Sequence, residues 1–354
     1  MKTFDFLVIG SGIAGLVYAL ETSKLGTVAV VTKANLKDCN TEYAQGGIAA
    51  VLSQHDSYEE HINDTFLAGS EIGKKSVIRT IVEEGPSCID YLIKLGTEFT
   101  KENDRLDRSI ENLSLTKEGG HSQKRVAFAA DSTGHEIMKA LISVCKKNTN
   151  IEIFEDHLAI DLITQHHISQ IESFIPRITC WGAYALDQKT SQINVFRANK
   201  TMLATGGAGR VFAYNTNPEI ATGDGFAMAR LAGARMANME FVQFHPTAFY
   251  DPEGKPFLVS EALRGEGAIL RLQDGTTFME KYHPRANLAP RDVVSRAIDH
   301  ELRKKGEKYV YLDATNIPKK KLQSRFPYID KKCRKRGIDF SVQPIPVVPA
   351  AHYY

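Results

Sequence analysis

The N-terminal segment constrains the fold of this chain more than any other part of the sequence. Residues 4–9 (FDFLVI) form a short, mostly apolar run bounded by glycine, which is typical of a buried parallel strand. A glycine-rich turn follows at 10–15, then an expected helix at 16–24 and a second buried strand at 27–32 (TVAVVT). This β-turn-α-β unit predicts an α/β fold built on a Rossmann-like sheet.

Three glycines in the turn, Gly10, Gly12 and Gly15, have the G-x-G-x-x-G spacing of a dinucleotide site. The first permits a tight turn, the second lets the backbone approach a pyrophosphate, and the third lets the helix pack closely on the strand. The helix N-terminus also offers free N–H groups and a positive dipole end to phosphates. The alternative is a glycine-rich turn without a ligand. The dinucleotide contacts expected here are Gly10, Ser11, Gly12, Ile13, Ala14 and Gly15.

One feature of a simple NAD site is missing from the sequence. An acidic residue about 20 positions further on normally holds the ribose, whereas Thr32 and Lys33 stand at the end of the second strand. Further glycine pairs follow at 46–47 and at 206–207. Glycines at such turns let a large planar ligand approach the backbone, which favours FAD over NAD.

Apolar periodicity predicts alternating helices and strands as far as residue 238. Asp224 precedes one of these helices and is either its N-cap or a contact to the cofactor. From residue 239 onwards prolines and loops replace this pattern. We therefore expect a first domain at 1–238, to which 345–354 returns, and an inserted α+β capping domain at 239–344. The expected helices are 56–96, 131–147 and 226–232, and the expected strands are 151–154, 159–164, a two-stranded meander at 178–198 and a separate strand from residue 200.

Composition and charge argue against several classes of partner. Lys plus Arg is 44 and Asp plus Glu is 42, and this balance gives no reason to expect nucleic acid. No run of about 18 apolar residues is present, so no membrane span is expected, and the strand at 4–9 leaves no room for a secretory signal. Five scattered cysteines without a CxxC pair predict free thiols in a reducing cytoplasm and no metal site. The basic stretch at 319–336 is typical of a solvated surface, with a binding patch as the alternative.

Six motifs in a fixed order make the chain resemble the fumarate reductase, succinate dehydrogenase and L-aspartate oxidase flavoprotein family. They are YAQGGIAA at 43–50, ATGGAG at 204–209, QFHPT at 243–247, EALRGEG at 261–267, APRDVVSR at 289–296 and PAAHY at 349–353. The resemblance implies FAD as the cofactor of the first domain. Besides the turn at 10–15, the residues expected to contact FAD are Lys33, Asn40, Thr41, Glu42, Tyr43, Ala44, Gln45, Gly46, Gly47, Gly206, Gly207 and Asp224.

Two features resemble the L-aspartate oxidase branch of this family. Membrane-bound members carry a histidine that bonds covalently to FAD, and Asn40 stands at that position here, so the resemblance implies non-covalent FAD. The segment TKEGGHS at 116–122 resembles the stretch whose glutamate, Glu118 here, faces the substrate amine. Without this context, Glu118 would be a solvated loop carboxylate.

A short dicarboxylate substrate requires cationic and hydrogen-bonding side chains, and arginine suits a carboxylate because its planar fork binds both oxygens. The resemblance assigns Arg291 to proton transfer with the substrate. Outside the family context Arg291 and Asp292 would form an ordinary ion pair at a helix start, and His245 would be a loop residue. The residues expected to hold the carboxylates are His245, Ser260 and His352, and Arg264, Gln243, Thr247 and Glu261 complete the expected wall of the site.

The resemblance implies oxidation of L-aspartate to iminoaspartate by hydride transfer to FAD, with electrons passed to oxygen or fumarate. This reaction would be the first step of de novo NAD biosynthesis, followed by quinolinate synthase. A soluble fumarate reductase, a truncated inactive remnant and, last, a plain NAD(P) dehydrogenase are the alternatives. Family members continue beyond position 354, so we expect weak FAD binding and low activity from the chain as it stands.

Overall fold

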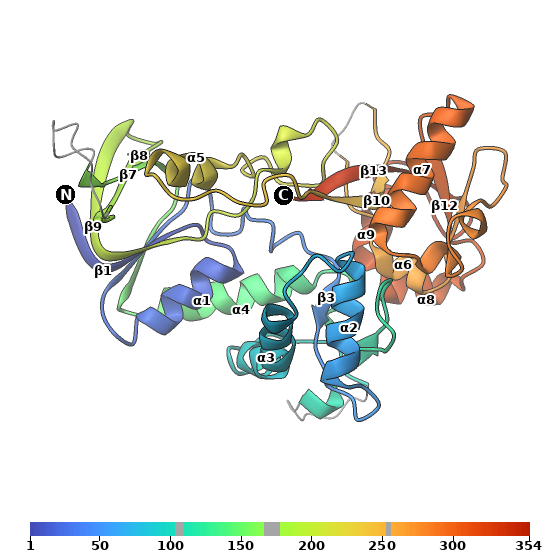
Figure 1. Cartoon of the computed structure of the whole chain (residues 1–354), viewed down its shortest axis with the longest axis horizontal. Coiled ribbons are helices and arrows are strands. Elements are labelled where there is room, and N and C mark those ends of the chain that lie inside the picture. The colour runs from blue at the N-terminus through green and yellow to red at the C-terminus, as the bar shows by residue number, and fades with distance from the viewer. Residues whose placement is uncertain (103–109, 166–177, 253–255) are drawn as a thin grey trace.

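The computed structural model describes residues 1–102, 110–165, 178–252 and 256–354. Two parts lie side by side (Figure 1). The first is built on a six-stranded sheet and the second on a four-stranded sheet. A third sheet of three short strands lies beside the first part, next to two helices.

The six-stranded sheet confirms the predicted Rossmann-like architecture. Its strand order is β6-β2-β1-β9-β8-β7. β6, β2, β1 and β9 run parallel, and β8 and β7 continue the sheet as an antiparallel meander. The strands are β1 (Lys2–Ile9), β2 (Val28–Val31), β6 (Ile151–Phe154), β7 (His157–Leu162), β8 (Gly182–Asp187) and β9 (Gln192–Leu203).

Helices cover both faces of this sheet, which explains why its central strands are apolar without alternation. Val8 and Val30 pack on one face with helices α1 (Ile13–Thr22) and α4 (Thr133–Lys147). Leu7 lies in the core of the opposite face, which helix α5 (Asp224–Leu231) covers. Figure 1 shows α1 and α4 on the side of the sheet opposite to α5.

Three of the predicted element boundaries are wrong. Helix α1 begins at Ile13 rather than at 16, because its first turn starts directly at the glycine turn. The helix expected at 56–96 is two helices, α2 (Tyr58–Ala68) and α3 (Lys75–Lys94), separated where Ser70 and Glu71 have φ values of 52° and 62°. The strand expected from residue 200 is the second half of β9, which pairs first with β8 and then with β1.

The second part has its own antiparallel sheet, with the strand order β10-β13-β12-β11. Its apolar core includes Phe278, Phe326 and Phe340, which are fully buried. Its strands are β10 (Gln243–Phe249), β11 (Ile269–Arg271), β12 (Val310–Asp313) and β13 (Ile345–Tyr353), and its helices are α6 (Glu261–Gly265), α7 (Arg291–Lys305), α8 (Lys319–Arg325) and α9 (Pro327–Arg334). The small third sheet consists of β3 (Gly47–Ala49), β4 (Leu115–Thr116) and β5 (Val126–Phe128).

Strand β13 connects the two parts. Along most of its length it pairs with β10 and β12 of the second sheet, and the expected return of 345–354 to the first domain stays a prediction. Only its end reaches the first part, where Ala351 exchanges backbone hydrogen bonds with Tyr214 and Thr216. The chain end consequently lies between the two sheets (Figure 1). The division at 238/239 remains a prediction.

Many cations of the basic stretch 319–336 have partners within the second part, which favours its interpretation as a surface region. Arg325 instead contacts the first part, where its guanidinium lies 3.7 Å above the ring of Phe128. The ion pairs are Lys319–Asp339, Lys321–Glu266, Arg334–Asp330 and Arg336–Asp251. Within the ranges described, no helix is long and apolar enough to cross a bilayer.

Candidate functional site

The glycine turn lies at the carboxyl edge of the parallel strands, where open α/β sheets bind their ligands. Gly10 has φ +112°, and a Cβ there would lie 2.1 Å from the carbonyl oxygen of Ala204. A Cβ on Gly15 would lie 2.0 Å from the carbonyl oxygen of Gly10. At Gly12 the nearest atom would be Thr41 Oγ1, at an ordinary 3.5 Å. The fold therefore requires Gly10 and Gly15, whereas Gly12 leaves open space for a ligand.

A cavity of about 600 Å³ opens at this edge. Helix α1 points its N-terminus into it, since Gly12, Ile13 and Ala14 all line the cavity. Gly12 is the N-cap and has no side chain, while Thr41 Oγ1 accepts one helix N–H, from Ile13, at 3.2 Å. The predicted residues that line the cavity are Gly10, Ser11, Gly12, Ile13, Ala14, Lys33, Asn40, Thr41, Gly206, Gly207 and Asp224.

Lys33 and Asp224 form an ion pair on the wall of this cavity. Lys33 Nζ donates to Asp224 Oδ2 at 2.5 Å and to Thr222 Oγ1 at 2.6 Å. Burial alone would raise the pKa of the Asp224 carboxyl, but the hydrogen bonds from Lys33 and Thr222 hold it below its ordinary value. The N-cap of α5 is Gly223, so the interpretation of Asp224 as an N-cap is wrong. An ion pair between residues 191 positions apart thus lies in the wall of this cavity.

A second cavity, of about 540 Å³, adjoins the first, and both share Asp38 and Asn40 in their walls. Tyr43, Ala44 and Gln45 line it together with His352. Gln45 Nε2 donates to the carbonyl of Leu258 at 2.7 Å, while Gln45 Oε1 is buried without a hydrogen-bond partner among the described residues. A ligand that donates a hydrogen bond would satisfy this oxygen, and the flavin ring has an N–H donor.

Four residues predicted to contact the cofactor do not line either cavity. Gly15 and Gly47 are packed against backbone, since a Cβ on Gly47 would lie 2.1 Å from the carbonyl oxygen of Ala127. Glu42 pairs with His135 at 2.6 Å. Gly46 accepts a hydrogen bond from Thr133.

A third cavity, of about 1090 Å³, lies beside the second part, and four of the candidate substrate residues line it: Glu118, Gln243, Glu261 and Arg291. His352 lines the second cavity, and the remaining candidates, Arg264, His245, Ser260 and Thr247, line none of these three cavities. Arg291 is the first residue of α7. Arg291 Nε donates to Glu261 Oε2 at 2.5 Å, and a terminal nitrogen donates to Gln243 Oε1 at 2.9 Å. The other terminal nitrogen lies 3.7 Å from Glu118 Oε2. Despite burial, the charges of Glu261 and Glu118 raise the pKa of Arg291, which therefore keeps its proton.

Arg264 is a second, fully buried cation in this cluster. One terminal nitrogen donates to the carbonyl of Asn287 at 2.5 Å, and the other lies 3.5 Å from Glu261 Oε1. Its Nε and that second nitrogen have no hydrogen-bond partner within the described ranges. Burial lowers the pKa of Arg264, and Arg264 and Arg291 together outweigh burial and lower the pKa of Glu261.

Two histidines approach each other behind this cluster, with ring centres 5.3 Å apart. His245 Nδ1 accepts a hydrogen bond from the backbone N–H of Thr247 at 3.2 Å. The proton of the neutral ring must then lie on Nε2, which is buried without a partner in the described part of the chain. Burial, followed by the charge of Arg291, places the pKa of His245 well below its ordinary value and that of His352 at about 3. Both rings are therefore neutral donors rather than cations.

Glu118 is not a solvated loop carboxylate, because its side chain is only 11% exposed. Burial and the neighbouring charge of Glu261 raise its pKa above the ordinary value, against the opposing effect of Arg291. A carboxyl with a raised pKa holds a proton more readily than an exposed one. A Cβ on Gly46 would lie 3.4 Å from Glu118 Oε1, so Glu118 lies next to the segment predicted to contact the flavin.

Ser260 and Thr247 have structural roles in addition to their places near the site. Ser260 is the N-cap of α6, and its hydroxyl accepts from the N–H of Ala262 at 3.2 Å. The Thr247 hydroxyl donates to the carbonyl of Val259 at 2.7 Å, which fastens β10 to the segment before α6.

Two residues at this site were not predicted from the sequence, Tyr353 and Gly119. Tyr353 lines both the second and the third cavity, and its position directly after His352 in a family motif was the available signal. Gly119 donates its backbone N–H to Glu261 Oε1 at 2.9 Å. A Cβ on Gly119 would lie 2.3 Å from that oxygen. Nothing in a single sequence indicates such a contact, since it joins residues 142 positions apart.

Comparison with known proteins agrees with this arrangement. The family described as FAD binding domain matches residues 5–354. An L-aspartate oxidase of Ralstonia nicotianae is 48% identical over 99% of this chain and 64% of its own length. A chloroplastic L-aspartate oxidase of Nicotiana tabacum is 49% identical over 99% of this chain and 54% of its own length. A solved structure of E. coli quinol fumarate reductase is similar over 100% of this chain and 61% of its own, with a TM-score of 0.88 at 33% identity.

The chain thus spans less than two thirds of the length of the curated relatives that it matches. The predicted family resemblance is confirmed, because the match covers nearly every residue of the chain. The assignments of individual site residues remain predictions.

Proposed function

This chain belongs to the FAD-binding domain family, and from that premise we propose that it acts in the FAD-dependent oxidation of L-aspartate to iminoaspartate, the first step of de novo NAD biosynthesis. Relatives named L-aspartate oxidase are 45–49% identical to it over 99% of its length. The identity to quinol fumarate reductase is lower, 33%.

The first two cavities suit FAD held without a covalent bond. The helix N-terminus at Gly12 offers backbone N–H groups to a pyrophosphate. Gln45 Oε1 offers an unused acceptor to the flavin ring. Asn40 lines both cavities, and its amide has no nucleophilic ring nitrogen to bond to the flavin. When bound, FAD accepts a hydride from the substrate Cα.

The observation that carries the proposal is the set of buried donors without partners. Arg264 Nε, a terminal nitrogen of Arg264 and His245 Nε2 are all buried and lack a hydrogen-bond partner within the described ranges, although that terminal nitrogen lies 3.5 Å from Glu261 Oε1. A buried unsatisfied donor costs about 1–3 kcal/mol, so this cluster is best satisfied by a ligand that brings several acceptor oxygens. Together with Arg291, it suits a short dicarboxylate, whose two carboxylates it would hold at fixed positions for hydride transfer.

Glu118 and Arg291 would have different roles in the oxidation. Arg291 keeps its proton and would bind a substrate carboxylate. Proton transfer with the substrate is a further role that the family resemblance implies for Arg291. The Glu118 carboxylate would bind the substrate amine, and its raised pKa favours acceptance of a proton from that amine. Neutral His245 and His352 would donate hydrogen bonds to carboxylate oxygens without adding charge.

The electrons would pass to oxygen or fumarate, and quinolinate synthase would consume the iminoaspartate. We further propose that the protein acts in the cytoplasm, because all five cysteines are free thiols.

Anaerobic reduction of the reconstituted flavoprotein tests the proposal. The chain is loaded with FAD and mixed with L-aspartate or with succinate, and the loss of flavin absorbance is followed. Reduction by aspartate and not by succinate is expected. Reduction by succinate alone would support the second candidate, a soluble fumarate reductase, which the TM-score of 0.88 favours. No reduction and no perturbation of the flavin spectrum by either acid would refute both.

A further inference from the structure

The segment that carries Glu118 and Gly119 is a loop between β4 and β5 with little internal structure of its own. Gly120 has φ +91°, and the described backbone of the loop makes one internal hydrogen bond, from the N–H of His121 to the carbonyl of Glu118 at 3.3 Å. Two adjacent glycines give such a loop many accessible conformations. Contacts outside the loop must therefore fix the position of Glu118 relative to Arg291.

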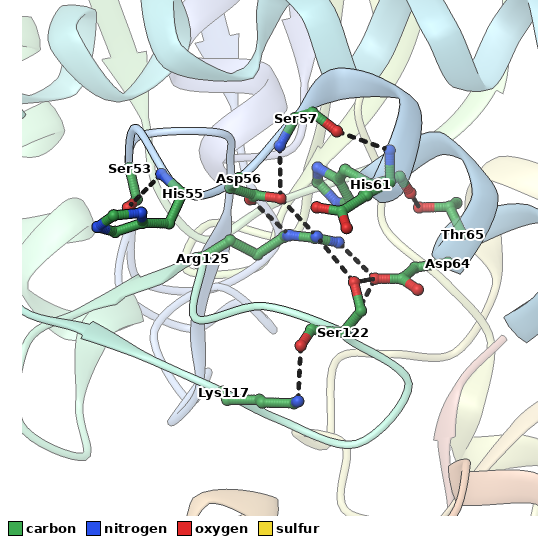
Figure 2. A network of polar contacts seen from close by, with 11 residues as sticks. Ser53, His55, Asp56, Ser57, His61, Asp64, Thr65, Lys117, Ser122 and Arg125 are labelled. Atoms are coloured by element: carbon green, nitrogen blue, oxygen red, sulfur yellow. Dashed lines mark hydrogen bonds and ion pairs between the residues drawn. The ribbon is translucent and has the colours of Figure 1, made fainter.

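One such contact lies at the far end of the loop, where Arg125 is fully buried. Arg125 binds Asp56 through both carboxylate oxygens, at 2.7 and 2.8 Å, and Asp64 at 2.7 Å. Asp56 precedes helix α2 and Asp64 lies within it. Figure 2 shows Arg125 reaching from the loop to both carboxylates. The guanidinium thus fastens the end of the loop to a helix.

Ser122 makes a further contact between the loop and Asp64 (Figure 2). Asp64 Oδ2 accepts from both the backbone N–H and the hydroxyl of Ser122, each at 2.7 Å. Arg125 donates to the same hydroxyl at 3.3 Å, and Lys117 Nζ donates to the Ser122 carbonyl at 2.6 Å. Only three residues separate Ser122 from Glu118. We call Arg125, Asp56, Asp64 and Ser122 the Arg125 network.

We propose that the Arg125 network is a positioning device that holds Glu118 against the substrate amine and so sets the preference for an amino dicarboxylate. The loop is anchored twice, by Ser122 on Asp64 and by the Gly119 N–H on Glu261. Loss of the first anchor leaves the loop held beside Glu118 by the Gly119 hydrogen bond, so that rotation at Gly120 can shift Glu118 relative to Arg291. This inference rests on the proposed function.

Asp64→Asn and Ser122→Ala test it in the FAD-loaded chain. The dissociation constants of L-aspartate and of succinate are measured from the perturbation of the flavin spectrum, under anaerobic conditions. Loss of a hydrogen bond between charged groups weakens binding by about tenfold or more, and we expect aspartate affinity to fall about tenfold in either variant. Succinate, which lacks the amine, should bind with its original affinity.

Asp313→Asn is a matched control in the second part. Like Asp64, Asp313 accepts from an arginine, Arg271, at 2.8 Å and from the N–H and hydroxyl of one residue, Thr315. Asp313 lines none of the three cavities. This variant should keep both affinities.

A double-substitution cycle with Glu118→Gln separates positioning from general damage. If Asp64 acts through Glu118, Asp64→Asn adds little to the loss of aspartate affinity already caused by Glu118→Gln. Three outcomes would overturn the inference while the proposed function stands. They are additive losses of aspartate affinity in the double variant, equal weakening of aspartate and succinate binding, and unchanged aspartate affinity in both Asp64→Asn and Ser122→Ala. If the unsubstituted chain binds neither acid, the proposed function itself fails.

Discussion

Replacing Gly12 with alanine separates the ligand-binding role of the glycine turn from its folding role. Gly12 has φ −68° and ψ 178°, a conformation that alanine adopts freely. Its added Cβ would meet only Thr41 Oγ1, at 3.5 Å. The methyl group would instead enter the space through which a pyrophosphate approaches the backbone. Gly12→Ala should therefore fold normally and bind FAD poorly.

The magnitudes follow from opposing effects. Alanine restricts the unfolded chain, which stabilises by about 0.4–1 kcal/mol, but it is a poorer N-cap than glycine, so the free energy of unfolding should change by less than about 1 kcal/mol. Loss of one or two hydrogen bonds to a charged phosphate costs about 1.5–3 kcal/mol each. Since about 1.4 kcal/mol is tenfold, FAD affinity should fall on the order of 100-fold.

Gly15→Ala is the contrasting variant. Its Cβ would lie 2.0 Å from the carbonyl oxygen of Gly10, so α1 must shift, and overpacking of this kind costs about 1–3 kcal/mol or more. Urea denaturation of the apo-protein gives the unfolding free energies, and titration of flavin fluorescence gives the FAD affinities. Unchanged FAD affinity in Gly12→Ala, or destabilisation equal to that of Gly15→Ala, would refute the reasoning.

Three further outcomes are expected. Arg291→Leu should abolish reduction of the flavin by aspartate while FAD stays bound, whereas Arg334→Leu, whose side chain is 43% exposed and lines none of the three cavities, should react normally. Activity in Arg291→Leu would remove that residue from the mechanism. Arg125→Ala removes the counter-ion of the buried Asp56 carboxylate and one donor to Asp64, which keeps its hydrogen bonds from Ser122. It should lower the unfolding free energy by about 3–5 kcal/mol, measured in urea; a loss below about 1 kcal/mol would contradict the burial of this network. Burial, aided by the charge of Arg125, depresses the pKa of His61 from 6.5 to about 4, so the stability that neutral His61 contributes is present above about pH 6.5 and is lost as the pH falls through about 4. His61→Phe should therefore remove about 2 kcal/mol of the decrease in unfolding free energy between about pH 7 and pH 5. An identical pH profile of stability in that variant would exclude His61 as the titrating group.

Local sequence determined the parts of the fold that depend on neighbouring residues. The strand at 4–9, the glycine turn and the strand at 151–154 were all predictable because apolar runs and glycine spacing act over a few positions. The prediction of a single helix at 56–96 was wrong because Ser70 and Glu71 adopt positive φ, which neither residue type signals. The prediction of a separate strand from residue 200 was wrong because β9, which pairs with two different strands, runs through this position without a break.

The candidate site divides in the same way. Motifs of the sequence indicated Arg291, His245 and Glu118 one by one, with the residue types that a dicarboxylate requires. Folding brings Glu118 and Glu261 to face Arg291 and lets Asp64 anchor the loop of Glu118, and neither contact was predictable from the residues alone. Strands, turns and the chemistry of single side chains were predictable, because they depend on short-range sterics and apolar periodicity. Burial, pKa values and charge pairing arise between residues tens to hundreds of positions apart, so they exist only once the chain has folded.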